Sequence, residues 1–151
     1  MPLKASPFRA LVWFFTRPKL QGTSCIVRCG SEILLVDYKY GSGWNFPTGL
    51  IQIENESPQE AAHRELMAEF SIKTKVLQYI GYVFCRFQCR RDRIYCFVVE
   101  LNTKEVNASN KDVRAIQWVP IKEIENVKIS PFSKEIIARW FKKQPQATSQ
   151  Q

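Results

Sequence analysis

The stretch from Ser57 to Phe70 constrains the fold more than any other part of this chain, because it carries a complete helix start. Ser57 stands where a helix N-cap is expected, and Pro58 occupies the first helical position, which needs no amide proton. Glu60 follows the cap at the spacing that closes a capping box. The sequence therefore predicts a helix that begins at Pro58.

Two stripes of side chains run along this predicted helix. Ala62, Leu66 and Phe70 recur at every fourth residue and form an apolar stripe. Glu65 and Glu69 form a second stripe, about 100° further round the helix. We expect one face of the helix to be buried and the adjacent face to be acidic.

Carboxylates one helical turn apart repel each other, and a bound cation removes that repulsion. Mg²⁺ prefers oxygen ligands and keeps several waters, so a few carboxylates together with substrate phosphates suffice to hold it. The alternative is a solvated acidic face, in which Arg64 neutralises Glu56 or Glu60 in an ordinary surface network.

The segment before the helix favours the metal site over the solvated face. Residues 44–49 read Trp-Asn-Phe-Pro-Thr-Gly, an aromatic run that ends in turn residues. Residues 50–53 then form a strand or a tight loop. A glycine at position 49 lets backbone carbonyls approach a ligand or a metal closely.

With these residues the chain resembles the Nudix hydrolases. Their signature is Gly, five residues, Glu, seven residues, then Arg-Glu, an aliphatic residue, any residue, Glu-Glu, any residue, Gly and an aliphatic residue. Here Gly49 is followed by Glu56 and then by Arg64-Glu65-Leu66-Met67-Ala68-Glu69-Phe70-Ser71-Ile72. The order of elements also looks like that of small MutT-like members, and the resemblance covers roughly residues 20–145.

The resemblance implies a role for each matched residue. Glu65 and Glu69 would be metal ligands, and the carbonyl of Thr48 or Gly49 would complete the metal shell. Glu56 and Arg64 would form the ion pair that braces the loop against the helix.

This chain departs from the signature in three ways. One extra residue separates Gly49 from Glu56, Ala68 replaces the first Glu of the Glu-Glu pair, and Ser71 replaces the closing Gly. The loss of a carboxylate at Ala68 favours a single ion over a two-metal clamp and weakens binding. Ser71 must end the helix at some strain cost or with a different cap.

Further residues are candidates for proton transfer and substrate binding. Related enzymes often take a general base from a loop across the cleft, and here Asp112 is favoured over Glu105. Excess positive charge, +8 in total, favours phosphate-rich ligands. The candidates for stacking on a base and for lining the substrate cleft are Trp44, Phe46, Tyr40, Arg86 and Arg93. For each of them internal packing or a solvated hairpin is the alternative.

The remaining pattern predicts one domain of α/β class, a Nudix α/β/α sandwich with a mixed sheet. Length and composition suit a single soluble domain with a real core. The expected strands cover residues 22–29, 33–38, 76–87, 94–101 and 113–119, with Gly30-Ser31 as a hairpin turn and residues 90–93 as a connection. A short helix is expected after Pro120 and a longer one over residues 131–141.

The ends of the chain differ from the domain over residues 20–144. Residues 1–19 form an apolar extension, which we expect to be helical and which is too short to cross a bilayer. Its partners are its own domain, a dimer mate or a membrane surface. Residues 145–151 have the composition of a disordered tail.

Cysteine and histidine usage narrows the remaining function classes. The odd count of 5 cysteines, with no secretory signal, favours a cytoplasmic protein with reduced thiols. Their pairwise spacing makes a structural zinc site conceivable, with small apolar core residues as the favoured alternative. A single histidine argues against a nucleophilic triad.

We therefore expect a hydrolase that uses Mg²⁺, or Mn²⁺, to cleave the diphosphate linkage of a nucleoside diphosphate linked to another moiety. The alternative is a catalytically weakened Nudix domain that binds a nucleotide or an RNA 5′ end, or that serves as an interaction module. The expected partner is a phosphorylated nucleotide-type small molecule, and a homodimer stays open.

Overall fold

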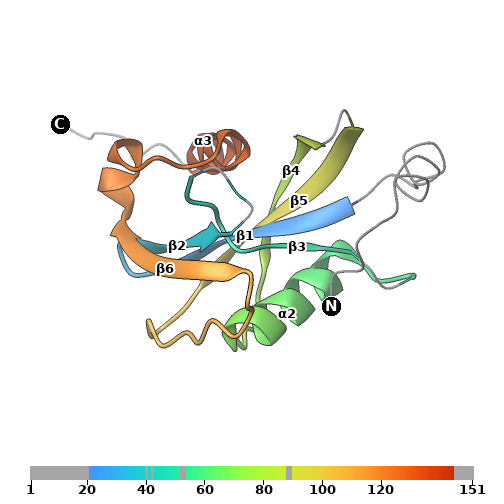
Figure 1. The fold of residues 1–151 in the computed structure, drawn as a ribbon, viewed down its shortest axis with the longest axis horizontal. Coiled ribbons are helices and arrows are strands. Elements are labelled where there is room, and N and C mark those ends of the chain that lie inside the picture. The colour runs from blue at the N-terminus through green and yellow to red at the C-terminus, as the bar shows by residue number, and fades with distance from the viewer. Residues whose placement is uncertain (1–20, 40, 42, 52–53, 88–89, 145–151) are drawn as a thin grey trace.

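The computed structural model describes residues 21–39, 41, 43–51, 54–87 and 90–144, which form a mixed sheet with helices on both faces (Figure 1). The predicted extension over residues 1–19 and the tail over residues 145–151 lie outside the described residues, as does Tyr40. Within the described part of the chain, no helix has the length and apolar character needed to cross a membrane.

Six strands build the sheet in the order β4-β5-β1-β2-β6, and β3 pairs with β1 beside this path. The strands are β1 (Gln21–Cys29), β2 (Glu32–Tyr38), β3 (Thr48–Leu50), β4 (Gln78–Phe87), β5 (Arg90–Glu100) and β6 (Val113–Pro120). β1 and β5 run parallel, and the other pairs are antiparallel. The predicted mixed sheet is confirmed.

The turn residues place most strand ends where the sequence predicts them. Gly30 has a positive φ of 59° in the turn between β1 and β2, a conformation that costs glycine little. Residues 90–93 differ from the prediction, because they lie in β5 and pair with β4 instead of connecting two strands. Strand pairing satisfies their backbone groups whatever their charge, so the ladder extends through them.

The helix α2 (Pro58–Phe70) begins and ends at the predicted residues. The backbone N–H of Glu60 donates to Ser57 Oγ at 3.1 Å, and the Ser57 N–H donates to the Glu60 carboxylate at 2.9 Å, which completes the capping box. Ser71 ends the helix with a φ of 56°, the left-handed conformation that usually favours glycine. The fold therefore accommodates serine at the position where the Nudix signature has glycine.

Two apolar layers hold the sandwich together, one on each face of the sheet. The helix α3 (Pro131–Lys143), which follows the short helix η1 (Ile121–Asn126), covers a core that includes Ile26, Phe46 and Trp140. On the opposite face α2 covers a core that includes Cys25, Leu66 and Phe70. Figure 1 shows these helices on opposite sides of the sheet, which confirms the α/β/α arrangement.

Candidate active site

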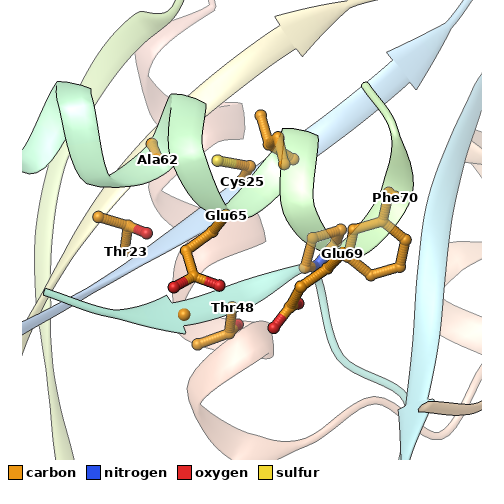
Figure 2. A pocket seen from close by; sticks show the side chains of 10 residues that line it. Thr23, Cys25, Thr48, Ala62, Glu65, Glu69 and Phe70 are labelled. Carbon is orange, nitrogen blue, oxygen red and sulfur yellow. The ribbon is translucent and has the colours of Figure 1, made fainter. Parts of the chain in front are cut away.

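A small hollow lies between α2 and β3, and both predicted metal-binding carboxylates line it. Its lining comes from β1, the segment that leads into β3, and one face of α2: Thr23, Cys25, Pro47, Thr48, Gly49, Ala62, Glu65, Leu66, Glu69 and Phe70. Figure 2 shows the Glu65 and Glu69 carboxylates pointing to the same side of the helix, toward β3 and Thr48. The acidic stripe therefore faces a built concavity rather than open solvent.

The hollow is too small to enclose a whole nucleotide. The space that the centre of a water-sized sphere can occupy in it is about 10 Å³, which is room for about one water molecule. Sites that enclose drug-sized ligands measure about 300–1,000 Å³. The hollow suits an ion and phosphate oxygens, and any nucleoside would lie outside it.

Arg64 joins the helix to the loop before it through the predicted ion pair with Glu56. Its Nε lies 2.7 Å from the Glu56 carboxylate, whose side chain is only 6% exposed, and its Nη2 also donates to the Leu50 carbonyl at 3.1 Å. Arg64 Nη1 lies 2.6 Å from Glu65 Oε1, a contact the sequence did not suggest. Arg64 therefore fixes both the loop and one of the two acidic side chains.

The electrostatic environment of Glu69 is unusual for a carboxyl group. Burial, followed by the nearby charge of Glu65, raises the pKa of Glu69 to about 7, and a hydrogen bond from Asn110 opposes this shift. Glu69 lies beside the Glu65 carboxylate on the same side of α2 (Figure 2), and no ion pair with Glu69 is found among the described residues. A hard divalent ion supplies cationic compensation.

Tyr38 and Ser24 organise the β3 side of the hollow, and sequence reasoning missed both. The Thr48 N–H donates to Tyr38 Oη at 3.1 Å, and Thr48 Oγ1 donates to the Phe46 carbonyl at 2.8 Å and lies 3.1 Å from Ser24 Oγ. Burial raises the pKa of Tyr38 well above its ordinary range, with a smaller contribution from Glu69, so the phenol stays protonated. This network holds the backbone that leads into Gly49.

The loop between β5 and β6 closes the other end of the site. Asn110 Nδ2 donates to Glu69 Oε1 at 2.9 Å, and Asn110 Oδ1 accepts the N–H of Asp112 at 2.9 Å. Asp112 is near enough to contribute to the raised pKa of Glu69. The loop thus brings the predicted general base toward the acidic pair, while the direct contact comes from Asn110, which no sequence signal identified.

The predicted substrate-binding residues are scattered. Phe46 is fully buried in the core beneath α3, so its ring has no free face, and the prediction that it stacks on a base is wrong. Trp44 is half-buried and packs against the same core. Arg93 stands on β5 with its Cζ 4.6 Å from the Tyr82 ring centre, and it is not among the residues that line the hollow. The side chain of Arg86 lies outside the described residues.

Glu65, Glu69 and one backbone carbonyl are oxygen ligands that suit a hard cation and would fill only part of its coordination shell. Among the described side chains, no group of three or more His, Cys, Asp or Glu is arranged to hold a metal ion. Glu65, Glu69 and a backbone carbonyl would leave several positions for water and phosphate, as Mg²⁺ requires. No disulfide joins Cys25, Cys29, Cys85 and Cys96, and none of them belongs to a cluster of three metal-binding side chains among the described residues. Cys89 lies outside the described residues.

A family comparison agrees with this geometry. The family model described as NUDIX domain matches residues 18–140, which is most of the chain and includes the hollow and both carboxylates. The chain belongs to the Nudix family. Nudix hydrolase 6 from Arabidopsis thaliana is 30% identical over 103 residues, which cover 63% of this chain and 36% of that protein. The Nudix domain described here spans little more than a third of the length of the curated plant relatives it matches.

Solved structures share this Nudix fold at low sequence identity. The NUDIX domain of Shewanella oneidensis NrtR, solved with ADP ribose, has a TM-score of 0.73 at 13% identity, with 91% of this chain and 97% of that domain covered. A bifunctional NMN adenylyltransferase/ADP ribose pyrophosphatase from Francisella tularensis, solved with AMP and a manganese ion, has a TM-score of 0.70 at 18% identity. That alignment covers 88% of this chain and 44% of the Francisella protein.

Proposed function

We propose that this Nudix domain hydrolyses the diphosphate linkage of a nucleoside diphosphate joined to another moiety, with the help of a divalent cation. The observation that carries the proposal is the convergence of Glu65 and Glu69 on one hollow beside Gly49. Binding of ADP ribose by one structural neighbour, and of AMP with manganese by another, supports a nucleotide-type substrate.

Glu65 and Glu69 would hold the cation, together with the carbonyl of Thr48 or Gly49. When bound there, Mg²⁺ or Mn²⁺ would neutralise the charge of phosphate oxygens and activate a water molecule. Arg64 holds Glu65 in place, and the Tyr38–Thr48 contact holds the carbonyl segment. Asp112 is the proposed general base, since it lies in the loop that closes the site near Glu69.

Because the hollow is small, most of the substrate would lie on the surface outside it. The hollow has room for an ion or individual phosphate oxygens beside the two carboxylates, so the nucleoside must extend over the surface outside. We propose Trp44 and Arg93 as surface contacts for a substrate that reaches beyond the hollow, since both remain partly exposed.

Turnover on a panel of linked nucleotides tests this proposal. Wild-type protein with Mg²⁺ or Mn²⁺ is expected to release a nucleoside monophosphate from a member of a panel that includes ADP ribose, dinucleotides and sugar nucleotides. Glu69→Gln is expected to abolish release, whereas Glu123→Gln, on the exposed surface of η1, leaves it unchanged. Equal turnover by wild-type and Glu69→Gln protein contradicts the proposed site.

A second candidate function is nucleotide binding without turnover. It is favoured by Ala68, which leaves only two carboxylates at the hollow, and by the lack of a three-ligand cluster among the described residues. Calorimetry with the same panel separates the two candidates. Saturable binding of a nucleotide without product formation supports the binding domain, and product formation rules it out.

A further inference from the structure

Asn110 is held on both sides by its own loop. Its carbonyl accepts the N–H of Val113 at 3.1 Å, and its side-chain Oδ1 accepts the N–H of Asp112 at 2.9 Å. Such an Asx turn fixes the side chain relative to the backbone. The amide group of Asn110 therefore has little freedom to turn, and its N–H donors point in a set direction.

That direction is toward Glu69. Asn110 Nδ2 lies 2.9 Å from Glu69 Oε1, although the two residues are 41 positions apart in sequence. The loop is also joined to the end of α2, because Ser109 N–H donates to the Glu69 carbonyl at 2.9 Å and Ser109 Oγ donates to the Ala68 carbonyl at 2.8 Å. The donor and the carboxylate thus belong to one connected unit.

We propose that Asn110 is a positioning residue that orients the Glu69 carboxylate for a divalent cation, an inference that rests on the proposed function. A carboxylate that can rotate freely loses rotational entropy when it ligates a metal. A fixed hydrogen-bond donor on one of its oxygens already restricts that rotation in the metal-free protein, so less entropy is lost on binding.

A purely structural role would give Asn110 a different purpose. In that case only the bond from Asn110 Oδ1 to the Asp112 N–H matters, because it shapes the loop. The two roles use different atoms of the same side chain. A substitution that keeps the acceptor but cannot reach Glu69 separates them, and serine is such a residue because its hydroxyl forms the equivalent turn on a shorter side chain.

The experiment is titration of the full chain with Mn²⁺, read as free Mn²⁺ by electron paramagnetic resonance. Asn110→Ala is expected to weaken Mn²⁺ binding by about tenfold or more, the usual effect of removing an outer partner of a metal ligand. Asn110→Ser is expected to remain weakened to a similar degree. The matched control is Asn107→Ala, which keeps the backbone bond from Asn107 to the Phe70 carbonyl and is expected to bind as wild type does.

Thermal unfolding of each variant accompanies the titration. Unfolding midpoints of Asn110→Ser and Asn107→Ala that match the wild type show that a loss of affinity does not come from a loss of fold. Recovery of wild-type affinity in Asn110→Ser, or affinity within twofold of wild type in Asn110→Ala, overturns the positioning role alone. A wild-type protein that binds no Mn²⁺ overturns the proposed function together with this inference.

Discussion

The Cα of Gly49 lies directly against the side chain of Glu65, so close that a Cβ added to the glycine would stand 2.4 Å from Glu65 Cγ and 2.6 Å from its Cδ. Neither distance is compatible with van der Waals contact. Glycine is therefore required here by the close approach of an acidic side chain, and this contact places Glu65 over β3.

Gly49→Ala is accordingly expected to displace Glu65. We expect Mn²⁺ binding to weaken about tenfold or more, and the free energy of unfolding to fall by about 1–3 kcal/mol, the usual cost of overpacking. Isothermal titration with Mn²⁺ and urea denaturation measure the two effects. In the Glu65→Ala background the added methyl group has room, so Gly49→Ala should there cost almost no stability. A full cost in that background would show that the strain arises elsewhere.

The raised pKa of Glu69 predicts how the metal-free protein responds to pH. Below its ordinary value of about 4.5 the carboxyl is protonated in the folded and unfolded states alike. Between about 4.5 and about 7 the unfolded chain releases the proton while the folded protein retains it. The free energy of unfolding should therefore fall as pH rises through this window and change no further above it as far as Glu69 is concerned.

Urea denaturation in the presence of a chelator, from pH 4 to pH 8, measures this dependence. In Glu69→Gln the free energy of unfolding should fall less between about pH 4.5 and about pH 7, because glutamine does not titrate. In Glu123→Gln it should fall as much as in the wild type. An identical decline in wild-type and Glu69→Gln protein would assign the pH dependence to other groups.

Removal of Arg64 should destabilise the loop before α2. Arg64→Ala takes the guanidinium from Glu56, whose side chain is 6% exposed, and from Glu65. Breaking a fully buried pair costs about 3–5 kcal/mol, and the partial exposure of Arg64 reduces the expected loss to about 2 kcal/mol. Urea denaturation provides the measurement. The double variant Arg64→Ala/Glu56→Gln should recover part of the loss, and no recovery would mean that the charge of Glu56 is not the cause.

Ala68→Glu should strengthen cation binding. Ala68 is exposed on α2 next to Glu69, and the substitution restores the carboxylate that the Nudix signature carries there. We expect the Mn²⁺ affinity to rise several-fold or a second ion to bind, as calorimetry will report. Met67→Glu adds the same charge at an exposed neighbour where the Nudix signature has no carboxylate, and should change little. Equal gains from both variants would indicate a general electrostatic effect.

Local signals explain why the helix and the turns were predictable. The capping box of α2 involves residues three apart, and the turn at Gly30 depends on a single backbone conformation, so each leaves a mark in a short stretch of sequence. The Glu56–Arg64 pair was also accessible, because both residues belong to one motif. By contrast, Phe46 was misread because nothing local shows which face of the sheet an aromatic residue joins.

The sequence by itself determined the family, the helix with its acidic stripe, and the mixed α/β class, because these depend on periodicity and on a contiguous motif. Only the tertiary structure decided which distant residues complete the site. Tyr38, Ser24 and Asn110, from β2, β1 and the loop before β6, hydrogen-bond to Thr48 or Glu69, which line the hollow, and these contacts depend on strand order and on loop docking. Contacts between residues far apart in the chain leave no local pattern, since the fold and not the spacing brings the atoms within hydrogen-bonding distance.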